Sequence, residues 1–421
     1  MAHSNVRHLR RVSPPLASYL RVGHRDAALV GKLLDQGFPV GAGIIVDPSA
    51  EARTTELRGS ALENGVEVIL DTRAVELSTV GGFSLSTVAK LPWAGTEPLD
   101  PASLSGSRGE AVVRAIAKCA IDHRSTGVLA PTRFLDDVAT WLDVDAELVS
   151  GLRSSLDANG AGTTTVYYPL VAPLRLLRDE TSLARIISSL RTLVAGREMD
   201  GVFLRIQGFG TSKAGARNLR SYILVARALH ELGVPSVGER TGCVGVALSA
   251  FGAVGGTESS LTYGENYDAR RLAKKPEGKG FVPAPRVYLP EAMLTLPVEQ
   301  ARAILSRRGF RRLACTRACC RSGRDAVLVD PRRHFVVTRA AELESMSCIP
   351  VVDRPEHFLT TSLIPARDNS AQIARFDPKI AKHRDRLDDW SLALHRTLRD
   401  DQSHQPTSSL VPTGRRLQLG A

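Results

Sequence analysis

The feature that most constrains this chain is a regular alternation of short β-branched runs with longer amphipathic stretches. The helical patterns cover residues 49–64, 108–123, 136–158, 180–195 and 214–232. The apolar runs cover residues 40–46, 66–70, 127–130, 164–170, 201–206, 235–238, 256–262 and 286–289. Such alternation is typical of parallel strands joined by crossover helices. Eight candidate strands predict an α/β fold, a closed (β/α)8 TIM-type barrel, with an open doubly wound sheet as the alternative.

The chain has 421 residues, which is enough for one barrel of roughly 250 residues and further additions. We expect a basic N-terminal arm and helix over residues 1–35 and the barrel over 36–296. A small cysteine-bearing C-terminal module should follow over 297–399, and a tail rich in Ser, Pro and Gln over 400–421 should be disordered. Residues 71–106 form an unusually long loop after a strand, which is typical of a lid.

Composition restricts the setting and the partners. No apolar run approaches the roughly 18 residues of a membrane span, and no apolar region follows the basic residues 7–11 as it would in a secretion signal. Six scattered cysteines do not make a disulfide framework. We therefore expect a cytoplasmic protein with reduced thiols. The net charge of +11 makes nucleic acid a candidate partner, gripped by basic residues in 7–11, 270–279 and 307–312, with ordinary solvated surface as the alternative.

Polar residues follow several of the apolar runs. The working groups of a parallel barrel project from the carboxyl ends of its strands. Six residues are candidates there, three carboxylates for catalysis and three side chains for substrate binding: Asp71, Glu239 and Glu258, and Arg133, Arg205 and Gln207. An arginine inside a barrel needs a carboxylate or an anionic ligand to offset its burial. We expect removal of Asp71 or Glu239 to cost activity rather than stability.

Two further segments have both a functional and a structural interpretation. The glycine-rich turn 208–213 ends in Lys213 and opens a helix, where backbone N–H groups suit an anion; an ordinary N-capped turn is the alternative. Asp47 also follows a strand, but Asp47-Pro48-Ser49 equally predicts an acidic cap at a helix N-terminus.

One compact set of soft metal ligands stands out after the expected barrel. It consists of Cys315, Cys319, Cys320 and His334, with Cys348 as another possible fourth ligand. Zinc takes four such donors in structural sites. Buried thiols without a metal are the other interpretation.

The layout resembles the tRNA-guanine transglycosylase family and its DNA-modifying relatives. The likeness rests on Asp71 at a strand end, the later Gly81-Gly82-Phe83 turn, and the cysteine and histidine set after the barrel. It implies that Gly82 and Phe83 hold a base and that zinc is structural. It also implies that a carboxylate attacks the sugar carbon of a nucleotide and displaces the base. An incoming base then displaces the carboxylate, while a second carboxylate transfers protons.

The chain departs from the family pattern in two ways. Asp71 is separated from Gly81, and the cysteine spacing is tighter than the family's. No aspartate ends a late strand, so Glu239 or Glu258 would serve as nucleophile. Two other functions stay open: a barrel enzyme in which Arg205 and the turn 208–213 clamp a small anionic metabolite, and a non-catalytic nucleic-acid-binding component.

Overall fold

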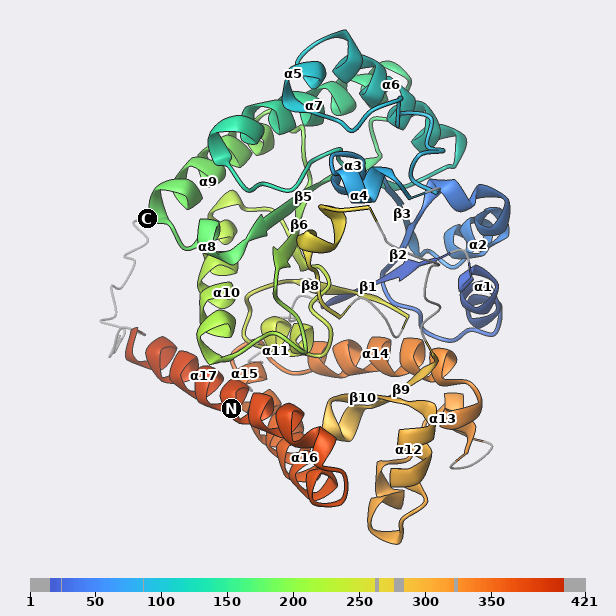
Figure 1. Ribbon diagram of the computed structural model, residues 1–421, viewed down its shortest axis with the longest axis vertical. Helices are drawn as coiled ribbons and strands as arrows, with labels where there is room; N and C mark the ends of the chain where they lie inside the picture. Colours follow the sequence, from blue (N-terminus) through green and yellow to red (C-terminus); the bar gives the residue numbers. More distant parts are fainter. Residues whose placement is uncertain are drawn as a thin grey trace, which may run out of the picture.

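A closed barrel of eight parallel strands forms the centre of the molecule (Figure 1). The computed structural model describes residues 16–23, 25–85, 87–261, 265–275, 284–321 and 325–404. Consecutive strands pair in chain order, and β8 pairs with β1 to close the ring. This is the expected (β/α)8 architecture. The strands are β1 Ala17–Val22, β2 Gly43–Val46, β3 Glu67–Asp71, β4 Gly127–Leu129, β5 Thr165–Pro173, β6 Gly201–Gln207, β7 Ser236–Gly238 and β8 Gly256–Ser260.

The barrel starts earlier in the chain than the sequence suggested. Strand β1 lies within the segment assigned to an N-terminal arm and helix, and it pairs with both β2 and β8. The run 286–289, expected as the last barrel strand, is instead β9 (Arg286–Leu289), which pairs antiparallel with β10 (Leu294–Pro297) outside the barrel. Seven of the eight expected runs are therefore barrel strands, and β1 supplies the eighth.

Side chains inside the barrel stack in layers. The middle of the interior is apolar and aromatic, filled by Tyr19, Ile45, Ile69, Leu129, Tyr167, Phe203 and Val237. Tyr19 and Tyr167 both meet the Phe203 ring edge-on, at 5.4 and 5.1 Å between centroids. Because strand side chains alternate with a period of two, Arg21, Asp71, Arg205 and Glu239 point into the same interior, one layer nearer the carboxyl ends. Sequence alternation thus places charge directly above an apolar plug.

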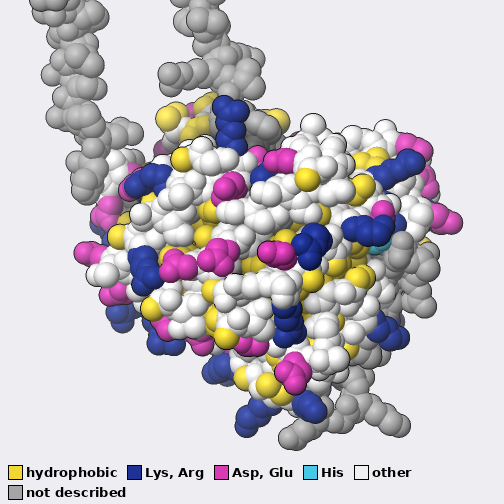
Figure 2. All heavy atoms as spheres, turned by 90° about the horizontal axis from the view of Figure 1, so that it is seen from above, with side chains coloured by type: hydrophobic (Ala, Val, Ile, Leu, Met, Phe, Trp, Pro, Cys, Tyr) yellow, Lys and Arg dark blue, Asp and Glu magenta, His cyan; other side chains and the backbone are white. Residues whose placement is uncertain are grey.

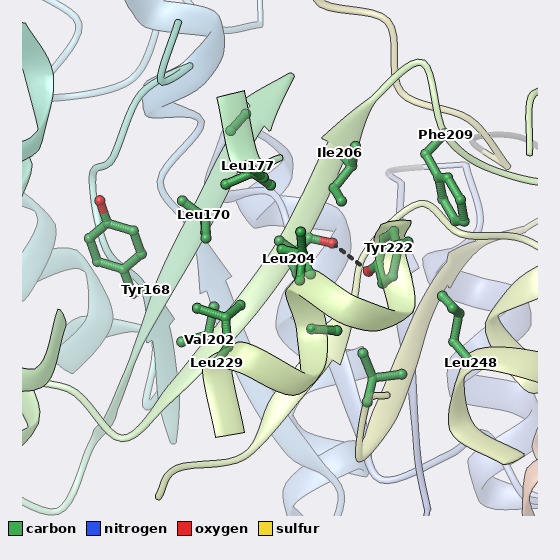
Figure 3. Packing of buried hydrophobic residues seen from close by; sticks show 14 of the residues in the cluster. Tyr168, Leu170, Leu177, Val202, Leu204, Ile206, Phe209, Tyr222, Leu229 and Leu248 are labelled. Atoms are coloured by element: carbon green, nitrogen blue, oxygen red, sulfur yellow. Dashed lines mark hydrogen bonds between the residues drawn. The ribbon is translucent and has the colours of Figure 1, made fainter. Parts of the chain in front are cut away.

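Outer helices cover the other face of the strands. Leu170, Val202 and Leu204 point outward from β5 and β6 into this layer (Figure 3). The hydroxyl of Tyr222 donates to the Leu204 carbonyl at 3.2 Å, which fixes α10 on the sheet. The covering helices are α1 Ala27–Asp35, α2 Glu51–Glu63, α6 Ser107–Asp122, α7 Val138–Ala158, α9 Glu180–Ala195, α10 Ala216–Ala228 and α11 Val244–Ala250.

The long loop after β3 is folded onto the barrel. It contains the short helices α3 (Ala74–Leu77), α4 (Val80–Phe83) and α5 (Pro101–Leu104). Trp93 is buried within it, and its indole N–H donates to the carbonyl of Thr72 at 2.9 Å. In this conformation the segment expected as a lid is part of the hydrophobic core.

The C-terminal helices complete the barrel's outer ring. Helix α14 packs against β1, α1 and α11, and α17 packs against α10. Trp390 of α17 is fully buried, and its indole N–H donates to the Ala214 carbonyl at 2.6 Å. Apolar residues between 335 and 398 therefore share the main core with the barrel, whereas most of those between 287 and 328 form a separate cluster with Ile373 and Ile380. The elements are α12 Val298–Leu305, α13 Ala326–Val329, α14 Pro331–Ser347, α15 Arg354–His357, a π-helix Phe358–Leu363, α16 Ile364–Phe376, η8 Pro378–Ile380 and α17 Ala381–His404.

The surface charge and the C-terminal end of the described chain bear on several sequence-based expectations. On the face in Figure 2, basic and acidic side chains are interspersed. Among the described helices, none is long and apolar enough to cross a membrane. Residues 400–404, expected in a disordered tail, belong to α17, and Asp400 and Asp401 pair with Arg220 and Arg227. Residues 1–15 and 405–421 lie outside the described part, including the basic residues 7–11.

Candidate functional site

Arg21 contacts three carboxylates at the carboxyl ends of the strands. Arg21 of β1 donates through Nε to Glu258 Oε1 at 3.1 Å and through Nη2 to Glu239 Oε1 at 2.5 Å. Its Nη1 pairs with Asp71 Oδ2. We call Arg21, Asp71, Arg205, Glu239 and Glu258 the Arg21 network. The three carboxylates that the sequence singled out for catalysis thus surround a single guanidinium.

Arg205 joins the network from β6. Its Nη2 donates to the same Glu239 oxygen that Arg21 contacts, and its guanidinium lies over the Tyr267 ring, 5.3 Å from the centroid. The expectation that a buried Arg205 needs a carboxylate is confirmed. Within the described residues, Glu239 Oε2, Arg205 Nε and the Tyr267 hydroxyl are buried without a hydrogen-bond partner. Buried polar atoms are almost always satisfied, so such a group of exceptions suggests a water or ligand position.

The backbone beside the network is strained at two arginines. Arg73 and Arg240 adopt the left-handed conformation, with φ of 54° and 58°, which costs a non-glycine residue about 1 kcal/mol. In return, the Arg73 amide donates to Asp71 Oδ1 at 3.1 Å and the Arg240 amide donates to Glu258 Oε2 at 2.9 Å. Strain of this kind is concentrated at functional sites.

An outer pair of carboxylates extends the network toward β2. Arg73 contacts Asp47 and Glu76, the latter at 3.2 Å. Asp47 also accepts from the Ser49 amide at 2.9 Å, so it caps the turn into α2 as its structural interpretation predicts.

The neighbouring arginines lower the pKa values of Asp71 and Glu239. Burial alone would raise the pKa of Asp71, but Arg21, Arg73 and Arg205 hold it at about 2. Burial would likewise raise the pKa of Glu239, and Arg205 and Arg21 lower it instead. The Asp71 side chain is 10% exposed, whereas those of Glu239 and Glu258 are 0% exposed. Asp71 is therefore the carboxylate that an entering molecule meets first.

Arg133 lies outside the Arg21 network. Its guanidinium pairs with buried Asp145 of α7 and stacks over Trp141, 4.3 Å from the ring centroid. Both residues of the ion pair are about 1% exposed. The structure gives Arg133 a packing role between a strand end and an outer helix. Gln207 ends β6, is partly buried, and pairs by its backbone with Tyr267.

The Gly81-Gly82-Phe83 turn is tightly packed. It forms most of α4, and a Cβ on Gly81 would collide with the carbonyl oxygen of Lys274, while one on Gly82 would collide with that of Glu76. Phe83 is partly buried against the main core. Close backbone approach explains the two glycines without a bound base.

The glycine-rich turn 208–213 has few free amides. The N–H groups of residues 208, 209, 211 and 213 donate to carbonyls, and that of Ser212 donates to Asn266 Oδ1 at 3.1 Å. Anion binding at such a turn needs free N–H groups. The structural interpretation of the turn therefore fits better, and Lys213 lies on its surface.

Cys315, Cys319, Cys320 and His334 come together into a group that could hold a metal ion. Their four ligand atoms all lie within 4.8 Å of one another. The sulfurs of Cys315 and Cys319 are 3.9 Å apart, and His334 Nδ1 lies 3.9 Å from Cys319 Sγ and 3.5 Å from Cys320 Sγ. Tetrahedral ligands at zinc's bond lengths are spaced by about 3.5 to 3.8 Å, so the donor set fits a four-coordinate ion.

The surroundings of this group also favour a metal. The Nε2 atom of His334 lies 2.8 Å from the Tyr288 carbonyl, a contact that orients the ring and leaves Nδ1 free for an ion. Cys348 is exposed and outside the group, so the alternative with Cys348 as a ligand has no support.

Sequence reasoning missed the residue at the centre of the site. Arg21 lies on a strand that was not predicted, although Tyr19 and Arg21 follow the period of two. Tyr267 and Arg73 were also missed, because each reaches the network from a loop, and only the fold brings them there.

Comparison with known proteins gives fold-level likeness alone. No protein-family model and no curated protein matches the sequence. Among solved structures, the chain is similar to the Penicillium canescens endo-1,4-beta-xylanase XylE, with 10% identity over 59% of this chain and 83% of that one and a TM-score of 0.40. A GH18 chitinase from Pseudoalteromonas aurantia is similar with 10% identity over 61% of this chain and 97% of that one, and with a TM-score of 0.37. Xylanase 10B from Thermotoga maritima is similar with 9% identity over 59% of this chain and 85% of that one, and with a TM-score of 0.38. These structures share the barrel, which the strand pairing establishes independently.

Proposed function

We propose that the Arg21 network is the catalytic site of an enzyme that transfers a glycosyl group. The observation that carries the proposal is the gathering of Asp71, Glu239 and Glu258 around Arg21 at the carboxyl end of the barrel, the end at which barrel enzymes act. Two carboxylates on one guanidinium are at most about 8 Å apart. Paired carboxylates of glycosidases work at separations of roughly 5 to 9.5 Å.

Asp71 is the group we assign to the sugar. An ionised carboxylate stabilises the positive charge that develops on an anomeric carbon, or bonds to that carbon. In the proposed reaction an Asp71 oxygen attacks the anomeric carbon, and the bond to the leaving group breaks with its electron pair going to that group. An incoming nucleophile then attacks the same carbon and releases Asp71 as a carboxylate.

The other members of the network position Asp71 and handle protons. Arg21, fixed by Glu239 and Glu258, holds Asp71 ionised. The Tyr267 hydroxyl is the remaining candidate for protonating the leaving group, since it has no hydrogen-bond partner among the described residues and burial raises its pKa, which keeps it protonated.

The substrate we propose is a nucleoside within a nucleic acid, with base exchange as the reaction. The net charge of +11 and the cysteine and histidine group beside the barrel support this choice, as does the resemblance to the transglycosylase layout. The small-anion alternative is weaker, because Arg205 and Arg21 already bind carboxylates and the turn 208–213 has few free amides. A non-catalytic role predicts nucleic-acid binding without base exchange, which the assay below distinguishes.

Zinc is the metal we propose for Cys315, Cys319, Cys320 and His334. Three thiol sulfurs and one imidazole nitrogen suit Zn²⁺, and a closed set of four protein ligands is the structural kind of site. His334 lies in the first turn of α14, which packs on β1, and it also contacts the Tyr288 carbonyl of β9. The ion would link these two elements.

The test is exchange of a labelled base. Purified protein is incubated with transfer RNA or with DNA and radiolabelled guanine, and label in the polymer is counted. Asp71→Asn should lower incorporation by roughly 10² to 10⁴-fold, and denatured wild-type mixtures should contain a covalent adduct on Asp71. The control is Asp137→Asn, which removes an exposed capping carboxylate of α7. Full activity of Asp71→Asn would reject the proposed role, and no release or exchange of any base would reject the nucleic-acid substrate.

A further inference from the structure

A basic cavity lies between the turn after β6, the hairpin β9–β10 and the start of α17. Its volume is about 290 Å³, at the lower end for ligand pockets. Residues from five places line it: the turn after β6, Glu265 in the segment after β8, the hairpin β9–β10, Gln300 of α12, and the chain from η8 into α17. Four cationic side chains face it, Arg286, Lys379, Lys382 and Arg386.

These four cations differ from those of the Arg21 network in having no ionic partner. Each network arginine pairs with a carboxylate, whereas none of the four forms an ion pair with any described residue. Arg286 donates only to the Thr295 carbonyl, at 2.8 Å. Glu265 is the sole carboxylate among the described lining residues, and its Oε1 accepts from the Thr295 hydroxyl at 3.0 Å. The lining residues therefore carry three more positive than negative charges, and the Asp377 carboxylate accepts a hydrogen bond from the lining side chain of Gln300.

Burial bears on two of the lining groups. It lowers the pKa of Arg386, although the carboxylates of Asp389 and Glu265 act in the opposite direction. It lowers the pKa of the adjacent His383 to about 4, so His383 adds no charge at neutral pH. Helix α17 begins at Ala381, at the wall of the cavity, and Asp377 caps the preceding turn η8 by accepting from the Lys379 amide at 3.0 Å. The side-chain cations, rather than the helix end, therefore make the cavity attractive to an anion.

We propose that this cavity binds a phosphate group. Two lysines and two arginines around a space of this size suit a phosphate, which accepts several charge-assisted hydrogen bonds at once. The cavity and the network are connected by one short segment: Glu265 lines the cavity, and Tyr267, two residues later, lies over Arg205. Phosphate binding by the cavity does not depend on the proposed function. The further statement that the cavity binds a backbone phosphate beside the reacting nucleoside rests on that function.

The experiment compares two double variants of equal charge. Lys379→Gln with Lys382→Gln removes two exposed lysines of the cavity, and Lys32→Gln with Lys118→Gln removes two exposed lysines from outer helices. Binding is measured by fluorescence anisotropy of a labelled single-stranded oligonucleotide of about 12 nucleotides. The cavity variant should bind roughly 10-fold more weakly, and the slope of log K against log salt should fall by about 1.4, since each contact to a single strand contributes about 0.7. The outer-helix variant should match the wild type.

A second arm separates the sources of phosphate. Inorganic phosphate and a nucleoside 5′-monophosphate are titrated by calorimetry against the same proteins. Loss of oligonucleotide and phosphate binding in the cavity variant alone supports a backbone phosphate. If the cavity variant loses binding of free phosphate but binds the oligonucleotide as the wild type does, the cavity is a phosphate site for a small phosphorylated ligand. Unchanged binding in both arms, or no binding by the wild type, overturns the proposal.

Two further variants sharpen the result. Glu265→Gln removes the one lining carboxylate and keeps an acceptor for Thr295, so phosphate should bind several-fold more tightly. Asp71→Asn should lose base exchange and keep oligonucleotide affinity. A failed catalytic proposal therefore leaves the binding result intact, and a failed binding proposal leaves the exchange result intact.

Discussion

The charged residues of the Arg21 network have to balance one another because they are removed from water. Arg21 and Arg205 lie in the layer above the apolar plug, and each contacts Glu239. An unpaired charge in such a place costs several kcal/mol. The network is therefore both a candidate site and a structural requirement, which changes the sequence-based expectation that its carboxylates could be removed without loss of stability.

We expect Glu239 and Asp71 to differ in their effects on stability. Glu239→Gln leaves Arg205 buried without its carboxylate, so the free energy of unfolding should fall by about 3 to 5 kcal/mol. Asp71→Asn leaves Arg21 with two carboxylates at a partly exposed position and should cost about 1 kcal/mol. Urea unfolding at neutral pH measures both. Equal losses for the two variants would contradict this division of roles.

His383 should make stability depend on pH. Burial lowers its pKa in the folded chain to about 4, and its Nε2 lies 3.0 Å from the Ala292 carbonyl. The unfolded chain binds the proton at its ordinary pKa of about 6.5. The contribution is therefore fully present above about pH 6.5 and is lost as the pH falls toward 4, by on the order of 3 kcal/mol.

The measurement is a difference between two proteins. Wild type and His383→Gln, which keeps a hydrogen-bond donor, are unfolded in urea at several values between pH 7.5 and 4.5. Subtraction removes the contribution of carboxylates common to both. Parallel pH profiles for the two proteins would show that His383 does not titrate in this way.

Among the strands, two segments differ from what their residue composition predicted. The run 286–289 has strand composition, but Leu294–Pro297 follows after a short turn, so β9 and β10 form a hairpin. Strand β1 follows the basic arm and contains Ser18 and Arg21, which interrupt its apolar character. Its alternation of inward Tyr19 and Arg21 with outward Leu20 and Val22 was the available signal.

The short helix α4 supplies a test of packing at this scale. Gly81→Ala places a methyl group against the backbone carbonyl of Lys274, and backbone cannot move aside cheaply, so we expect a loss of about 1 to 3 kcal/mol. Gly59→Ala is the control, because Gly59 is exposed in α2 with nothing near a new Cβ, and it should gain up to about 1 kcal/mol. Thermal unfolding of the two variants should shift in opposite directions; shifts of the same sign would reject the packing explanation.

For the whole molecule, the C-terminal helices hold the barrel and the metal-ligand group in one body. Helix α17 returns across α10, with Trp390 buried between them, while α14 covers β1 and carries His334 near its start. The core is continuous from the barrel into these helices. Loss of a contact at the cysteines can therefore alter the packing at β1.

Removal of the proposed zinc should loosen one region first. Elemental analysis should find about one zinc per chain, and after chelation hydrogen exchange should rise over residues 308–320 and the first turns of α14, because these segments lose a shared anchor. Strands β4 to β6 should stay protected. Cys320→Ser should reproduce the effect, and exposed Cys348→Ser serves as its control. Absence of metal from freshly prepared, reduced protein would remove the zinc proposal.

The sequence by itself determined the architecture and the chemical inventory. Local periodicity set seven of the eight barrel strands and five of the outer helices, because apolar faces must be buried whatever their partners. The short spacing of Cys315, Cys319 and Cys320 made the metal-ligand group visible before the fold was known. The placement of Asp71 and Glu239 at or directly after strand ends followed from the same periodicity, whereas Glu258 lies within β8.

Only the tertiary structure decided how those residues combine. Arg21 meets carboxylates 50, 218 and 237 residues away in the chain, and such pairings depend on ring closure, which no local pattern encodes. The same closure separated Arg133 from the network, packed Gly81 and Gly82 against distant backbone, and gathered four unpaired cations at the start of α17. Secondary structure is a local response to burial, whereas a site is a meeting of distant strand ends and loops that exists only when the whole chain is folded.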